Sequence, residues 1–169
     1  MKVKPVQDQE HDRIWLLFDV CREIEGIFAE LYHYYSDLFS DNQEVSRMWK
    51  KTAMEEENHQ HQFALARRML SNIDCVANVD IDSVVTIRDK LLKLVPYMKK
   101  NPPDLVTALT RAIELEEKLM DLHASRAVCF SDPETKKFFS AMINFDQDHV
   151  ETIRSQLKKA TANGQPEAK

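Results

Sequence analysis

Four long segments of this chain repeat their apolar residues every three or four positions, which is the spacing of one face of an α-helix. These segments run approximately over residues 8–36, 42–71, 103–130 and 133–160. Only two of the 169 residues are glycine, and runs of β-branched residues are few. The pattern therefore predicts an all-α protein in which each long helix buries one face.

Two of the turns between these segments carry helix-start signals. Ser40 or Asp41 can cap the second helix, since short polar side chains accept hydrogen bonds from the first free backbone N–H groups. Asp132 followed by Pro133 is typical of the start of the last helix.

The connection between the second and third long segments is unusually long. It contains an expected loop at 72–82, a shorter amphipathic helix at 83–98 and a stop at 101–103. A connection of this length is expected where the chain must travel the length of a helical bundle. We therefore predict a four-helix bundle of two helical hairpins joined by a crossover that contains a short helix. The bundle should form one domain over 1–160, followed by a disordered tail at 161–169.

Charged or imidazole side chains interrupt each apolar stripe near its middle. The stripe of the second segment reads Val45, Trp49, Thr52, Glu56, His59, Phe63, Ala66 and Leu70. Over all four stripes, the interrupting residues are Glu25, Glu56, His59, Glu116, Asp146 and His149. No lysine or arginine lies on these stripes to neutralise the acids, although burying unpaired charge is costly.

The spacing of these residues repeats between the two halves of the chain. Glu25 and Glu56 are 31 residues apart, and Glu116 and Asp146 are 30 residues apart. Each member of a pair lies about 15 residues from its turn, which is about 22 Å at a rise of ~1.5 Å per residue. In antiparallel hairpins all the interrupting side chains would meet at the middle of the bundle.

Carboxylates packed together in an apolar interior repel one another unless a cation neutralises them. Two divalent metal ions would do so. One glutamate from each of two helices, with an acid-x-x-histidine pair from each of the other two, is the dinuclear carboxylate arrangement of helical bundles, and its ligands suit iron or manganese. The alternative is a polar layer that holds the register of the bundle without metal.

At these positions the chain resembles the ferritin-like superfamily, and most closely the rubrerythrin-type proteins. The motifs that carry the resemblance are Glu23-Ile24-Glu25 with Tyr32, Glu55-Glu56-Glu57-Asn58-His59, Ile113-Glu114-Leu115-Glu116 and Asp146-Gln147-Asp148-His149. The resemblance covers about residues 8–160.

The resemblance implies a role for each carboxylate. Glu25 and Glu116 look like terminal ligands, and Glu56 and Asp146 like bridging ligands. These four carboxylates would also be the catalytic groups. Asp146 stands where the family has glutamate, so this bridge would be shorter by one methylene group.

The resemblance also implies roles for the nitrogen ligands and their neighbours. His59 and His149 look like the two imidazole ligands. Tyr32 and its repeat partner His123 look like groups that hold the ligands in place from outside.

Two further departures from rubrerythrins affect the expected function. Leu119 occupies the position of their extra third-helix carboxylate, and the paired CxxC motifs of their rubredoxin-like module are absent. The resemblance implies reduction of hydrogen peroxide or dioxygen at two iron ions, with manganese or zinc as possible substitutes. An external donor such as a rubredoxin-like protein would supply the electrons. The alternative is iron sequestration, or a structural bundle without turnover.

Composition limits the partners and the compartment. The net charge of −5 and the pI near 5.7 argue against nucleic acid. Three cysteines without CxxC spacing indicate a reducing compartment, and no apolar run reaches the length of a membrane span. We therefore expect a soluble cytoplasmic protein, and a homodimer because such bundles usually pair.

Overall fold

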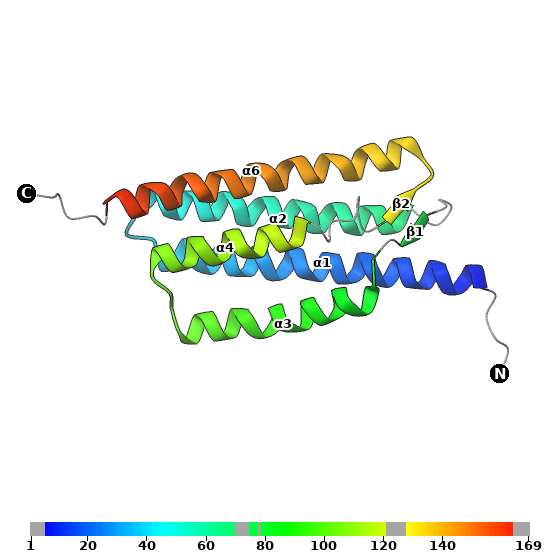
Figure 1. Cartoon of the computed structure of the whole chain (residues 1–169), viewed down its shortest axis with the longest axis horizontal. Helices are drawn as coiled ribbons and strands as arrows, with labels where there is room; N and C mark the ends of the chain where they lie inside the picture. The colour runs from blue at the N-terminus through cyan, green and yellow to red at the C-terminus, as the bar shows by residue number, and fades with distance from the viewer. Residues whose placement is uncertain (1–5, 70–74, 78, 121–127, 164–169) are drawn as a thin grey trace, which may run out of the picture.

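The computed structural model of the protein describes residues 6–69, 75–77, 79–120 and 128–163, and for 138–148 it describes the backbone alone. These residues are mostly helical, which confirms the all-α prediction. The long helices lie alongside one another (Figure 1). No helix in the described ranges is both long enough and apolar enough to cross a membrane.

The first two helices form an antiparallel hairpin. Helix α1 spans Val6–Leu38 and α2 spans Gln43–Met69, and the two pack along their length (Figure 1). Asn42 caps α2, because its side-chain oxygen accepts a hydrogen bond of 3.2 Å from the backbone N–H of Val45. The expectation that Ser40 or Asp41 would cap this helix is therefore wrong.

A shorter helix carries the chain back from the end of this hairpin. Helix α3 spans Ile81–Lys100, slightly more than the predicted 83–98, and packs against α1. Its N-cap is Asp80, whose carboxylate accepts a hydrogen bond from the backbone N–H of Ser83. Helix α3 thus lies beside part of α1 and carries the chain back toward the end of the molecule where α4 begins (Figure 1).

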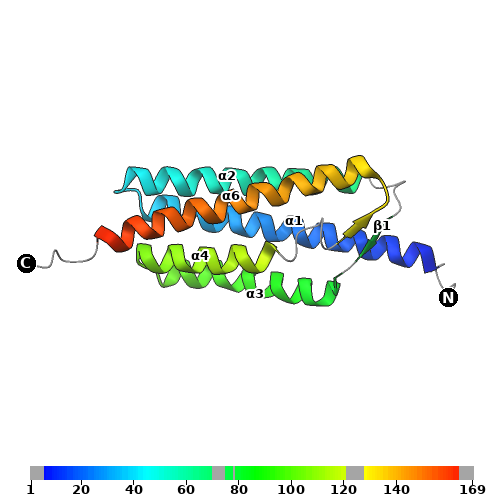
Figure 2. The ribbon, with the colours of Figure 1, turned by 45° about the horizontal axis from the view of Figure 1, so that its top comes forward.

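The second pair of helices completes the arrangement. Helix α4 spans Leu105–Met120 and α6 spans Pro133–Asn163, and α6 packs against both α4 and α2 (Figure 2). Asp132 caps α6, as predicted, by accepting the backbone N–H of Thr135 at 2.7 Å. Because α6 continues to Asn163, the prediction of disorder is wrong for 161–163, and 164–169 lies outside the described residues.

Two short strands were not expected. Strand β1 spans Cys75–Ala77 and β2 spans Val128–Phe130, and they pair antiparallel with Val76 opposite Cys129. The prediction of a loop throughout 72–82, and of a helix continuing to residue 130, is therefore wrong at these strands. Three residues are too few to show a strand periodicity, and each strand depends on a partner far away in the sequence.

Candidate metal centre

Four helices each contribute a buried polar side chain to one region in the middle of the molecule. Glu25 comes from α1, Glu56 and His59 from α2, Glu116 from α4 and His149 from α6, and each side chain is at most 4% exposed. They lie on the same helix faces as the apolar core, so the packing of the helices brings them together. These are five of the six residues predicted as metal ligands.

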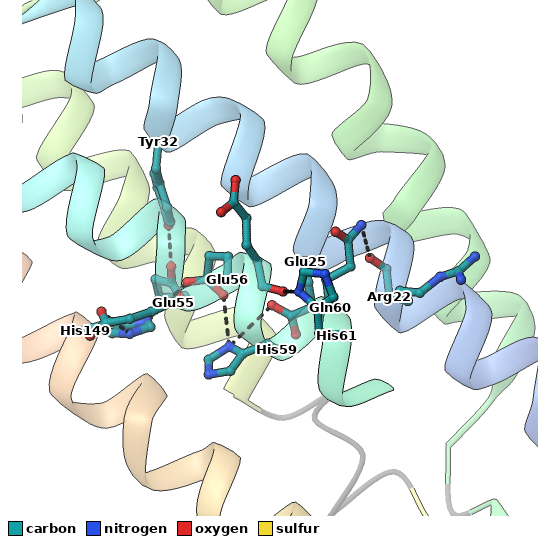
Figure 3. A network of polar contacts seen from close by, with 11 residues as sticks. Arg22, Glu25, Tyr32, Glu55, Glu56, His59, Gln60, His61 and His149 are labelled. Carbon is teal, nitrogen blue, oxygen red and sulfur yellow. Dashed lines mark hydrogen bonds and ion pairs between the residues drawn. The ribbon is translucent and has the colours of Figure 1, made fainter. Parts of the chain in front are cut away.

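Glu56 lies at the centre of this group. Its Oε2 atom is 3.1 Å from Nδ1 of His59, and its Oε1 atom is 3.2 Å from Nδ1 of His149 (Figure 3). Glu25 approaches the same nitrogen of His59 at 3.7 Å. Each oxygen of a single carboxylate therefore faces a different imidazole.

Potential ligand atoms form two clusters that share Glu56. The first cluster contains Glu25, Glu56 and His59, and the second contains Glu56, Glu116 and His149. Within each cluster the ligand atoms lie within 4.8 Å of one another, which is close enough to surround one ion. Each cluster could hold one metal ion, and the two clusters have the Glu56 carboxylate in common.

Two of the predicted residues cannot be placed in the same way. Asp146 lies in α6, three residues before His149, but its side chain is outside the described part of the structure. His123, expected to support a ligand from outside, lies wholly outside the described residues.

The charges in this region depend strongly on one another. Burial by itself would raise the pKa of Glu56, but contacts with His149 and His59 hold that pKa well below its usual range. Burial would lower the pKa of His59, whereas the Glu25 and Glu56 carboxylates raise it to about 11. The pKa of His149 is also raised against the effect of burial, chiefly by Glu56. The neighbouring carboxylates therefore favour the protonated, cationic form of both imidazoles when no metal is bound.

Three polar atoms in this region make no well-directed hydrogen bond to any side chain that the structure describes, although each lies near an oppositely charged group. They are Oε1 of Glu56 and both ring nitrogens of His149, all buried. Protonated imidazoles compensate the charge, but their geometry leaves these atoms unsatisfied, which is unusual in a protein interior. A metal ion between Glu56 and His149 would accept a lone pair from each, so the residues present fit a metal.

Tyr32 supports the second cluster from outside. Its hydroxyl donates a hydrogen bond to Oε1 of Glu116, which orients that carboxylate. Burial and the neighbouring Glu116 raise the pKa of Tyr32 well above its ordinary value, so the phenol keeps its proton.

We expect the Tyr32→Phe variant to bind metal at the Glu116 position about tenfold more weakly, since loss of an outer hydrogen-bond partner typically costs 10–100-fold in affinity. A competition titration of zinc against a chromogenic chelator measures this change. Tyr97→Phe is the matched control, because Tyr97 is 56% exposed on α3. Equal zinc affinity in the unmodified protein and Tyr32→Phe would contradict the assigned role.

The sequence interpretation missed Glu55. Its Oε2 atom lies 2.7 Å from Nε2 of His149, on the side of the ring opposite Glu56. Glu55 lies beside the apolar stripe of α2 rather than on it, so the stripe did not predict that Glu55 would reach the site. The buried face of a helix is wider than a single line of residues, and this width is the one signal in the sequence that could have suggested Glu55.

A surface pocket of about 400 Å³ between α2 and α6 reaches this part of the site. Its lining includes Lys51, Thr52, Glu55 and His149. Nζ of Lys51, at the exposed side, is 3.6 Å from Oε1 of Glu55. Small solutes can therefore approach the His149 side of the cluster from solvent.

The structure also clarifies Leu119 and Cys21. Leu119 is buried in the apolar core, where its side chain offers no ligand atom. Cys21 is a buried free thiol one turn before Glu25, and burial raises its pKa, so it stays protonated. Neither residue adds a ligand to the two clusters.

Comparison of the chain with protein-family models, with curated proteins and with solved structures gives no match in any of the three.

Proposed function

We propose that the protein is a ferritin-like four-helix bundle that binds two iron ions and reduces hydrogen peroxide or dioxygen with electrons from an external donor. The observation that carries the proposal is the position of Glu56, whose two oxygens face two different histidines in two clusters. A carboxylate placed in this way is suited to bridge a pair of ions.

The chain's own residues would divide the work of holding these ions. Glu25 and His59 would complete the first position, and Glu116 and His149 the second, with Glu56 common to both. A bound ferrous pair would supply two electrons, the number needed to reduce one peroxide molecule to water. Tyr32 would keep Glu116 oriented, and the pocket beside His149 would admit the oxidant.

The ligand set favours iron or manganese over softer metals. The two described clusters offer carboxylate oxygens and imidazole nitrogens and no thiolate. Carboxylates also stabilise the more highly charged oxidised ion, because they neutralise its extra charge. In this proposal an external donor such as a rubredoxin-like protein would supply the electrons, and the chain would form a homodimer.

The proposal is tested by anaerobic loading with two equivalents of ferrous iron per chain, followed by one equivalent of hydrogen peroxide. We expect rapid appearance of the ferric absorption, its loss on re-reduction, and the same response to a second addition of peroxide. Dioxygen is added to a parallel sample in place of peroxide.

Three other outcomes would contradict the peroxidase or oxidase activity. Oxidation followed by accumulation of many irons per chain would indicate iron storage instead. Binding of two ferrous ions without oxidation would indicate a binding role. Failure to bind iron at all would leave a structural polar layer in the bundle.

A further inference from the structure

A line of aromatic side chains leads from the candidate metal centre toward the surface. The ring of Tyr32, whose hydroxyl contacts Glu116, stacks on Trp49 with centroids 5.3 Å apart. The ring centroids of Trp49 and Tyr35 are 5.1 Å apart, and those of Tyr35 and Tyr34 are 5.8 Å apart. Tyr34 is only half-buried and donates its hydroxyl to the backbone carbonyl of Met98.

Packing alone does not explain why two of these residues are tyrosine and tryptophan. Tyr35 and Trp49 are 0% exposed, and among the residues that the structure describes neither the Tyr35 hydroxyl nor the Trp49 indole N–H has a hydrogen-bond partner. A buried polar group without a partner lowers stability and calls for an explanation. Phenylalanine would fill much of the same space without this cost. Tyrosine and tryptophan differ from phenylalanine in that each can reversibly give up one electron at potentials that strong oxidants reach.

We propose that Tyr32, Trp49, Tyr35 and Tyr34 conduct oxidising equivalents away from the metal centre to the protein surface, where a soluble thiol removes them. This inference rests on the proposed function, because it needs iron and peroxide at the site. Its role would be to prevent damage whenever the metal supplies fewer electrons than the oxidant requires.

The electrons and protons of this step balance. Reduction of hydrogen peroxide to two water molecules takes up two electrons and two protons. If the metal provides one electron, Tyr32 can provide the other and pass its phenolic proton to Glu116, whose carboxylate already accepts that hydrogen bond. Both protons that the peroxide takes up come from solvent, because the phenolic proton of Tyr32 stays on Glu116.

Electrons then move inward along the aromatic line, so the oxidised residue lies progressively closer to the surface. Trp49 returns an electron to Tyr32, which recovers its proton from Glu116. Tyr35 gives an electron to Trp49 and regains one from Tyr34, and it keeps its phenolic proton because its hydroxyl has no acceptor among the described residues. Tyr34 is then the oxidised residue and releases its proton to water. One thiol then gives an electron and a proton to Tyr34, and two such thiyl products combine as a disulfide.

The test uses protein loaded with one equivalent of ferrous iron per chain, so that electrons from the metal are limiting. Hydrogen peroxide is added, and samples are frozen after different times for electron paramagnetic resonance. We expect an organic radical signal that narrows when the tyrosine rings are deuterated. Added glutathione should shorten its lifetime in the unmodified protein.

Two variants interrupt the path independently. Tyr35→Phe and Trp49→Phe should each slow the quenching of the radical by glutathione about tenfold or more, the effect of a barrier higher by about 1.4 kcal/mol. Tyr35→Phe removes only an unpartnered hydroxyl, so it should fold with an unchanged or higher melting temperature. Tyr97→Phe, on the exposed face of α3, should behave like the unmodified protein.

The outcomes separate this inference from the proposed function. Ferric absorption that develops without any organic radical, or a radical quenched equally fast in Tyr35→Phe and Trp49→Phe, would overturn the path and leave the peroxidase proposal standing. Absence of iron oxidation by peroxide would overturn both.

Discussion

The Glu56→Gln variant should bind less than one equivalent of ferrous iron under anaerobic conditions, whereas the unmodified protein should bind two. Glutamine keeps the shape of the side chain but removes its negative charge and one of its two acceptor oxygens. Because the two oxygens of Glu56 face His59 and His149 separately, one substitution affects both ion positions. Metal analysis after equilibrium dialysis measures the stoichiometry.

Thermal unfolding gives a second measurement of the same effect. A ligand at 100 times its dissociation constant stabilises the native state by about 2.7 kcal/mol per site, so filling even one site should raise the melting temperature by about 5–10 °C. This increase should be lost in Glu56→Gln.

The control for both measurements is Glu57→Gln on the next residue of α2. Glu57 is partly exposed and lies 2.9 Å from Nε2 of His33, away from the clusters. The Glu57→Gln variant should bind two equivalents of ferrous iron. A Glu56→Gln protein that folds and still binds two irons would contradict the bridging position.

The stability of the metal-free protein should fall as the pH rises from about 6.5 toward 9. The pKa of His59 is raised in the folded protein from 6.5 to about 11, so its protonated form favours folding. That contribution is complete below pH 6.5 and is lost progressively as the pH approaches 11, with a slope on the order of 1 kcal/mol per pH unit. His149, whose pKa is also raised, adds to the same trend.

Glu56 sets the acid limit of this dependence. The pKa of Glu56 is lowered in the folded protein, so the charged carboxylate favours folding. This contribution to stability is complete above pH 4.5, the ordinary pKa, and is lost as the pH falls through the lower pKa of the folded protein. Stability without metal should therefore be greatest between about pH 4.5 and 6.5, where the acid and both imidazoles are charged.

Metal should reverse the trend at neutral and alkaline pH. An ion displaces the protons of His59 and His149, so its affinity, and the stability it confers, increase with pH. Urea unfolding at several pH values, with and without zinc, measures both slopes.

Histidine variants serve as controls for the pH experiment. His59→Gln should flatten the metal-free slope, whereas the exposed His61→Gln should leave it unchanged. Metal-free stability that rises between pH 6.5 and 9 would show that the imidazoles are not the cations of the cluster.

Helical periodicity in the sequence accounts for much of this fold. A residue's position on a helix face follows from local backbone geometry, so the apolar stripes and their interrupting residues could be read without a structure. The equal distances of Glu25 and Glu56 from their turn also predicted that they would meet. The same periodicity predicted the short helix α3 within the long connection between α2 and α4.

Contacts between distant segments could not be derived in this way. The pairing of β1 with β2 depends on residues more than 50 positions apart, and each strand has only three residues. The cap of α2 is Asn42 rather than Ser40 or Asp41, because the helix begins at Gln43, directly after Asn42. Side-chain acceptors compete closely in such turns, and the backbone path decides among them.

At the candidate metal centre, helical periodicity predicted five of the buried residues that gather, but it missed Glu55 and could not predict how the side chains face one another. The stripes placed Glu56, His59 and Glu116 toward a common interior because helix faces are set locally. The rotation of α6 relative to α2 places His149 between Glu55 and Glu56, and the position of α4 relative to α1 allows Tyr32 to reach Glu116. Such contacts depend on the angles between helices and on side-chain rotamers, which are settled only when the whole core packs together.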